Sequence, residues 1–187
     1  MYYHASAIKN ITRLEPRKSN HGVPLIYFST KRENTLVYLS NAIEKYCREI
    51  DFKYEGPCSK WGPYGFTPEG ILRLEEYYPN AIEETYSGVS GYIYSVVNVN
   101  DSGFELNIPF AVTSNEAVEV KSSEFVFDAY EEILKAEKEG KIVISRYSSM
   151  DDRKKEWIAE TINREYMEAA DHPEYRKFLE GKFGVNI

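Results

Sequence analysis

The sequence predicts an α+β fold on three observations. Residues 91–99, GYIYSVVNV, alternate aromatic and β-branched side chains in the way that is typical of a strand. Residues 125–138 carry apolar side chains at the spacing of an amphipathic helix, which Gly140 would end. The predicted strands and helices do not alternate strictly along the chain, which disfavours a doubly wound parallel sheet and favours an α+β arrangement.

The N-terminal part of the chain is expected to hold two short strands, residues 1–5 and 24–28, joined by a loop. Ser29 or Thr30 would then cap a helix, with Glu33 completing a capping box three residues after Thr30. The apolar side of this helix consists of Leu36, Tyr38, Leu39, Ile43 and Tyr46.

The glycines and prolines of residues 51–66 break regular structure, and the aromatic residues between them could line an acceptor cleft or cover a core. Pro68 at a first helical position predicts a helix that ends near Tyr78. Residues 104–112 and 117–120 are predicted strands, interrupted at 113–115.

The C-terminal part is expected to contain a strand at residues 142–144 and a charged helix at 151–170. Trp157, Ile158 and Ile162 would lie on one side of that helix.

Length and composition indicate one folded domain, or one domain with an appendage. The chain has 187 residues, of which 42% are hydrophobic and 28% charged, so it is not a wholly disordered chain. Its net charge of −7 argues against binding nucleic acid through bulk positive charge. Residues 1–60 nevertheless carry +4 and the remainder −11, which would place an acidic ligand on the N-terminal part. Chance segregation of surface charge explains this asymmetry equally well.

Cys47 and Cys58 have neither the spacing nor the histidine partners of a zinc site, and two cysteines do not make a disulfide framework. We expect no metal and two thiols in a reducing compartment. The first residues lack the apolar region of a signal peptide, and no run approaches the ~18 apolar residues of a membrane span. A cytoplasmic location without a membrane partner is therefore expected.

Three segments carry candidate site residues. His4 and Ser6 are two apart, so they point to the same side of an extended chain and could both bond a ligand. A surface histidine with an ordinary partner is the commoner explanation. Tyr27 and Tyr38 could sandwich a flat ligand, and Thr35 shares a helix face with Tyr38. Taken alone, the tyrosines are explained better by a place in the core.

The third segment contains two carboxylates, Glu116 and Glu119. At a separation of three residues they would point to opposite faces of a strand, so only one would face a given site. A solvated carboxylate at a sheet edge is the alternative, and it fits Glu119 better than Glu116.

Together these segments resemble the ADP-ribosyltransferase superfamily of the His–Tyr–Glu type, and within it the catalytic domain of the poly(ADP-ribose) polymerases. That family has His-Gly-Ser or His-Gly-Thr on its first strand, where this chain has His-Ala-Ser at 4–6. It has Tyr-Phe-Ala and then a Ser and a Tyr on a helix, matched in spacing by Tyr-Phe-Ser at 27–29, Thr35 and Tyr38. Its Asn-Glu at a strand opening corresponds to residues 115–116.

The resemblance covers residues 1 to about 120. It implies a split β-sheet core with flanking helices, in a domain of residues 1–147, and leaves 148–187 as a C-terminal helical extension packed on or beside it. The chain departs from the family pattern at Ala5, which replaces a glycine and adds a methyl group near the nicotinamide, and at Thr35, which replaces a serine.

The resemblance further implies that the chain binds NAD. Ser6 and the backbone of Ala5 would hold the carboxamide, and His4 would bond a hydroxyl of the adenosine-side ribose. Candidates for the diphosphate are Arg13, Arg17 and Lys18, although each of them taken singly is better explained as a solvated loop residue. The residues implied to bind NAD are His4, Ala5, Ser6, Tyr27, Phe28, Thr35 and Tyr38.

The implied reaction transfers ADP-ribose from NAD to an acceptor and releases nicotinamide. Bond cleavage leaves an oxocarbenium-like ribose, which the Glu116 carboxylate would stabilise more than it stabilises the ground state. Stacking favours the cationic ring present before cleavage, so Tyr38 would position the substrate without accelerating the step. The implied catalytic residues are Glu116, His4 and Tyr38.

The acceptor is unknown, and a protein or small molecule is expected before a nucleic acid. RNA 2′-phosphotransferases also use NAD, but they need several basic residues, which an acidic chain disfavours. With water as the acceptor the chain would be an NAD glycohydrolase. The alternative from another class is a non-catalytic module of the same fold that binds NAD, ADP-ribose or a partner.

Overall fold

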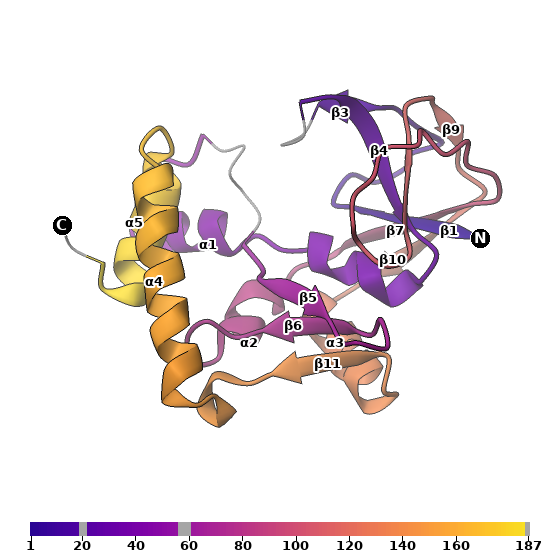
Figure 1. The fold of residues 1–187 in the computed structure, drawn as a ribbon. Helices are drawn as coiled ribbons and strands as arrows, with labels where there is room; N and C mark the ends of the chain where they lie inside the picture. Colours follow the sequence, from indigo (N-terminus) through magenta and orange to yellow (C-terminus); the bar gives the residue numbers. More distant parts are fainter. Residues whose placement is uncertain (19–21, 56–60, 186–187) are drawn as a thin grey trace.

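The protein is built on a six-stranded antiparallel sheet (Figure 1). A computed structural model describes residues 1–18, 22–55 and 61–185. The strand order is β10-β7-β1-β4-β3, with β8 also paired to β4, so β1 lies between β7 and β4 in the interior of the sheet. The strands of this sheet are β1 (Tyr2–Ser6), β3 (Arg17–Lys18), β4 (Pro24–Ser29), β7 (Gly91–Val96), β8 (Ala111–Ser114) and β10 (Ser122–Val126).

A second sheet has the strand order β11-β6-β5, and the short 3₁₀ helix η1 (Arg32–Tyr38) lies between the two sheets (Figure 1). β6 is antiparallel to β5 and parallel to β11. The α+β class predicted from the sequence is thereby confirmed. The remaining strands are β5 (Tyr64–Phe66), β6 (Leu72–Glu75) and β11 (Ile142–Ser145), and a two-stranded pair of β2 (Arg13–Leu14) with β9 (Val118–Glu119).

The main buried cluster joins the two sheets. Leu36 and Val37 of η1 pack in it with Leu72 and Leu74 of β6 and with Ile93 of β7. The helices α2 (Ala81–Tyr86) and α3 (Ala129–Lys138) complete it. This cluster fixes the place of η1 against β1.

A second buried cluster lies at the other end of the molecule, among helices α1, α4 and α5 (Figure 1). Phe178, Leu179 and Ile162 are almost fully buried there. No described residue of β1 or β4 belongs to it. Helices α4 and α5 share this cluster with α1 and Trp61, which precede residue 147 in the chain. The proposed domain boundary after residue 147 therefore stays a prediction. The helices are α1 (Ala42–Glu49), α4 (Asp152–Glu168) and α5 (Pro173–Phe183).

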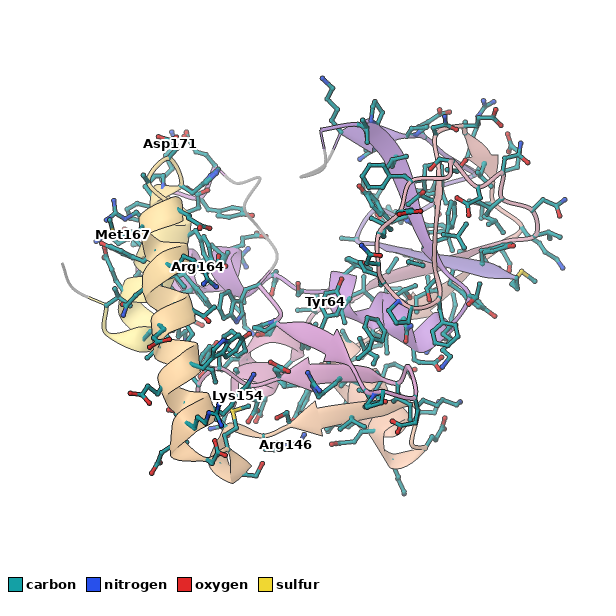
Figure 2. The ribbon with its side chains drawn as sticks, viewed as in Figure 1. Tyr64, Arg146, Lys154, Arg164, Met167 and Asp171 are labelled. Carbon is teal, nitrogen blue, oxygen red and sulfur yellow. The ribbon has the colours of Figure 1, made fainter. Side chains whose placement is uncertain are left out.

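The predicted helix at residues 151–170 is confirmed as α4, but Trp157 does not share the buried side of Ile158 and Ile162. Trp157 is 44% exposed, whereas the two isoleucines are buried. Lys154, labelled in Figure 2, places its ammonium over the Trp157 ring at 3.9 Å from the centroid. Helix α5 was not predicted, and Cys58 lies outside the described residues.

The predicted capping box is wrong. Ser29 still belongs to β4, and its hydroxyl accepts a hydrogen bond from the Lys31 amide at 3.0 Å, so it closes a turn. The helix begins at Arg32 after an extended Lys31, without a side-chain cap. The single predicted helix is also interrupted at residues 39–41, which separate η1 from α1.

The helix predicted to begin at Pro68 is a β-hairpin. Residues 67–71 form its turn, in which the Gly70 amide donates to the Thr67 carbonyl at 2.8 Å and Gly70 has φ +79°. In β6 the buried Leu72 and Leu74 alternate with the half-buried Arg73, which is the period of a strand. The threonine and proline therefore begin a turn that needs a glycine, not a helix.

Other boundaries differ in the same region of the sheet. The predicted strand at 104–112 is reduced to β8 (Ala111–Ser114), which includes two residues of the predicted break. Residues 122–126 form β10, so helix α3 starts later than predicted, after Asp128. The Asp128 carboxylate accepts from the amides of Tyr130 and Glu131 and caps that helix.

No helix among the described residues is long and apolar enough to cross a membrane.

Candidate functional site

His4 lies on β1, where its ring reaches across to β4. Its Nδ1 is 2.9 Å from the Tyr27 carbonyl oxygen. A carbonyl only accepts, so Nδ1 is the donor of this hydrogen bond. The ring also meets the edge of Phe28 at a centroid distance of 6.0 Å. The two neighbouring strands therefore fix the orientation of this histidine.

Two cavities meet at this histidine. The larger, here called the outer cavity, has a volume of about 640 Å³ and is lined mainly by residues 4–18 and by β4. The smaller, here called the inner cavity, has a volume of about 30 Å³ and extends toward η1 and β5. The residues that line both cavities are His4, Ala5, Tyr27 and Tyr38.

The structure brings together all seven residues predicted to bind NAD. Besides the four shared residues, Ser6 lines the outer cavity, and Phe28 and Thr35 line the inner cavity. Their convergence follows from the pairing of β1 with β4 and from the packing of η1 against both strands. Thr35 is buried, and its hydroxyl donates to the Arg32 carbonyl at 2.7 Å, which ties it to the turn of η1.

Tyr38 ends η1 at the mouth of the inner cavity. Its hydroxyl lies 3.4 Å from that of Tyr64, which stands on β5 at the junction of the two sheets (Figure 2). Burial of the phenol, and next the neighbouring Tyr64, raise the pKa of Tyr38 well above its ordinary value of 10. Tyr38 is therefore neutral over the physiological pH range and keeps its hydroxyl proton.

Basic side chains line the outer cavity, among them the three predicted diphosphate candidates Arg13, Arg17 and Lys18. Arg13 lies 3.0 Å from the carboxylate of Glu15 and 3.7 Å from that of Glu119. Arg17 and Lys18 form no ion pair within the described parts of the chain. This side of the cavity can therefore bind an anionic group.

Glu116 lies elsewhere. It is in the turn between β8 and β9, where its amide donates to the Ser114 hydroxyl at 3.2 Å and its carboxylate accepts from the Asn100 side chain at 2.9 Å. It lines a third cavity, of about 430 Å³, together with Glu119. This third cavity shares no lining residue with the other two.

The opposite-face argument for the two carboxylates does not hold. Only Val118 and Glu119 are in strand β9, so Glu116 does not follow the alternation of that strand. A turn that includes residues 115–117 lets Glu116 and Glu119 line the same cavity. Residue spacing therefore does not decide which of the two carboxylates faces a given site.

The cavity residues that were not singled out from the sequence include Glu15 and Asn34, whereas Tyr64 belongs to the aromatic segment 61–66 that was expected to line an acceptor cleft or cover a core. Glu15 is the one carboxylate among the described residues that line the outer cavity. Asn34 and Tyr64 line the inner cavity. The position of Asn34 directly before Thr35 was the available signal for it. Glu15 carries no local signal, because its approach to the cavity depends on the path of the loop after β1.

Comparisons of the chain with protein-family models, with curated proteins and with solved structures give no match.

Proposed function

We propose that this protein is an NAD-dependent ADP-ribosyltransferase with the split-sheet fold of that superfamily. The observation that carries the proposal is the convergence of the seven predicted NAD-binding residues on two cavities that share four lining residues. The outer cavity, at about 640 Å³, lies within the range of roughly 300–1,000 Å³ that ligand sites occupy. The acceptor is unknown.

In the proposed reaction the nicotinamide leaves with the electron pair of its bond to ribose. A lone pair of the acceptor forms the new bond to the same carbon, and the acceptor loses a proton. The ribose carries positive charge in the transition state, so a nearby carboxylate lowers the barrier. The basic side chains of the outer cavity would hold the diphosphate.

Glu116 is proposed as that carboxylate. Because it lines the third cavity, its turn would have to present the side chain to the ribose when NAD is bound. Glu15 already lines the outer cavity, and its partner Arg13 would be drawn toward the diphosphate. Glu15 is therefore the second candidate for the same role.

The test measures nicotinamide release from NAD by the wild type and by three variants, Glu15→Gln, Glu116→Gln and Glu119→Gln. We expect Glu116→Gln to lower the rate by roughly 10²–10³, the usual effect of removing a group that stabilises transition-state charge. Glu119→Gln is the matched control from the same cavity and should change little. An active Glu116→Gln beside an inactive Glu15→Gln would transfer the role to Glu15.

The position of Glu116 favours one second function, a non-catalytic module that binds NAD or ADP-ribose. Incubation with NAD followed by mass measurement of protein and nucleotide separates the possibilities. Modified protein indicates transfer, and free ADP-ribose with nicotinamide indicates an NAD glycohydrolase. Intact NAD together with a thermal shift indicates the binding module, and intact NAD without a shift contradicts the proposal.

A further inference from the structure

Asn34, the third residue of η1, is buried with its whole polar end unpartnered. It is 7% exposed, and neither Nδ2 nor Oδ1 has a hydrogen-bond partner within the described residues. Leaving a buried donor or acceptor unsatisfied costs stability, and such groups in a folded protein call for an explanation. Among the described residues, Asn34 is the one side chain with two separate buried polar atoms that both lack a hydrogen-bond partner.

Asn34 lines the inner cavity, and most of the other residues that line it are apolar. They include Phe28, Phe66, Leu106 and Ile108. A group that pairs with an asparagine side chain must offer an acceptor to Nδ2 and a donor to Oδ1, side by side in one plane. A primary carboxamide has that arrangement, and an aromatic ring attached to it suits the apolar walls.

We infer that Asn34 binds the carboxamide of the nicotinamide ring, with Nδ2 donating to the carboxamide oxygen and Oδ1 accepting from its NH₂ group. This inference rests on the proposed function and deepens it, since it names the side chain that selects the ring. The resemblance gives this contact to Ser6 and the backbone of Ala5. Ser6 lines the outer cavity only, and its hydroxyl accepts from the Ile8 amide at 3.2 Å.

The inner cavity must widen to admit the ring, because its volume is about 30 Å³. Its cover includes Leu106, Ile108 and Pro109, which lie in the irregular segment before β8. Within this segment Asn107 has φ +52°, in the left-handed region that non-glycine residues seldom occupy. The inference therefore requires this segment to move outward when the ring binds.

The experiment compares ligands that differ only in the carboxamide. Benzamide is paired with acetophenone, and NAD with its 3-acetylpyridine analogue, so that a methyl group replaces NH₂ in each pair. Dissociation constants are measured by calorimetry for the wild type, Asn34→Leu and Asn34→Ala. The leucine variant keeps the volume, and the alanine variant avoids any clash. Ser40→Ala is the matched control, because Ser40 is also buried with an unpartnered hydroxyl but lines neither the inner nor the outer cavity.

The wild type should bind each carboxamide at least tenfold more tightly than its acetyl partner. Both Asn34 variants should lose this preference, while Ser40→Ala keeps it. The ligand-free Asn34→Leu protein should unfold at the same or a higher temperature than the wild type, since it no longer buries an unsatisfied amide. A merely structural Asn34 would leave the preference unchanged, which overturns the inference.

The ligand pairs separate this inference from the proposed function. A wild type that binds NAD and its acetyl analogue equally well overturns the inference and leaves NAD binding intact. A wild type that prefers benzamide through Asn34 but does not bind NAD overturns the proposed function and keeps the carboxamide contact. Binding of none of the four ligands overturns both.

Discussion

Aromatic side chains gather in two regions of this protein, and the two groups differ in what surrounds them. In the second buried cluster, among helices α1, α4 and α5, the Trp61 ring packs against Phe178 and Phe183 at centroid distances of 5.3 and 5.7 Å. The Tyr78 ring meets Phe183 there at 5.4 Å. These rings fill a core. At the site, Tyr38 is 37% exposed and borders open volume.

Residues 61–66 are one aromatic segment in the sequence, but they contribute side chains to both regions. The aromatic residues of 61–66 were expected either to line a cleft or to cover a core. Trp61 covers the helical core, and Tyr64 and Phe66 line the inner cavity beside Tyr38. The place of Trp61 in a core is confirmed, whereas an acceptor cleft at Tyr64 and Phe66 stays a prediction. Aromatic content alone does not separate the two roles, because the partners come from helices and strands that are distant in sequence.

The largest expected effect concerns the helical region. Trp61→Ala should lower the free energy of unfolding by about 3–5 kcal/mol, the usual cost of removing a large buried aromatic side chain. Urea unfolding followed by circular dichroism measures it. Because no described residue of β1 or β4 belongs to this cluster, the affinity of the remaining folded protein for NAD should change little.

Trp157→Ala is the matched control for that substitution. Trp157 is 44% exposed and meets Tyr77 only edge to face, so its loss should cost about 1 kcal/mol or less. Equal losses for the two tryptophans would contradict the role of Trp61 in the core, and a loss of NAD binding by folded Trp61→Ala would show that the two aromatic regions are not independent.

Tyr38→Ala should have the opposite signature, a large effect on ligand binding and a smaller one on stability. NAD at a hundredfold excess over its dissociation constant stabilises the wild type by about 2.7 kcal/mol. We expect this thermal shift to disappear in Tyr38→Ala and to persist in Tyr38→Phe, which keeps the ring and removes the hydroxyl that lies 3.4 Å from that of Tyr64. A full shift in the alanine variant would place Tyr38 with the core aromatics instead.

The sequence predicted the strands that carry the site better than the helices between them. β1, β4 and β7 have unbroken apolar or alternating patterns, so their positions follow from local sequence. The hairpin at residues 64–75 was missed because a threonine followed by Pro68 is compatible with a helix start as well as with a turn. Only the buried pairing of β6 with β11 decides between them.

The seven binding residues that line the two cavities of the site could be predicted from the sequence, but the position of the Glu116 carboxylate relative to them could not. Tyr27, Thr35 and Tyr38 lie at a fixed spacing on adjacent elements, so their convergence follows from one strand and one helix. The place of Glu116 depends on how the turn between β8 and β9 is bonded, through Asn100 and Ser114. No periodicity encodes such a turn, so its direction could not be read from the sequence.

The smallest expected effect tests how η1 is held in place at the end opposite to Tyr38. Arg32 donates to the Glu124 carboxylate on β10 through Nε at 2.9 Å and through Nη2 at 2.6 Å, and also reaches Glu132 on α3 at 3.1 Å. The hydrogen bond to Arg32 is the main reason why the pKa of Glu124 lies below its ordinary value of 4.5.

Glu124→Gln should therefore remove a pH-dependent part of the stability. A carboxyl whose pKa is lowered by folding stabilises the folded state above its ordinary pKa, and this contribution is lost as the pH falls through the lowered value. The wild type should thus lose more unfolding free energy than Glu124→Gln between about pH 5 and pH 3. The difference should be at most about 1 kcal/mol, because the Glu124 side chain is 54% exposed and water screens the pair.

Urea midpoints between about pH 5 and pH 3 measure this difference, and the double variant Arg32→Met, Glu124→Gln completes a thermodynamic cycle. NAD binding should be unchanged in Glu124→Gln, because the packing of Leu36 and Val37 between the sheets still holds η1. Parallel pH profiles for the wild type and Glu124→Gln would show that this ion pair does not stabilise the folded state, and a weakened affinity for NAD would show that it orders Tyr38.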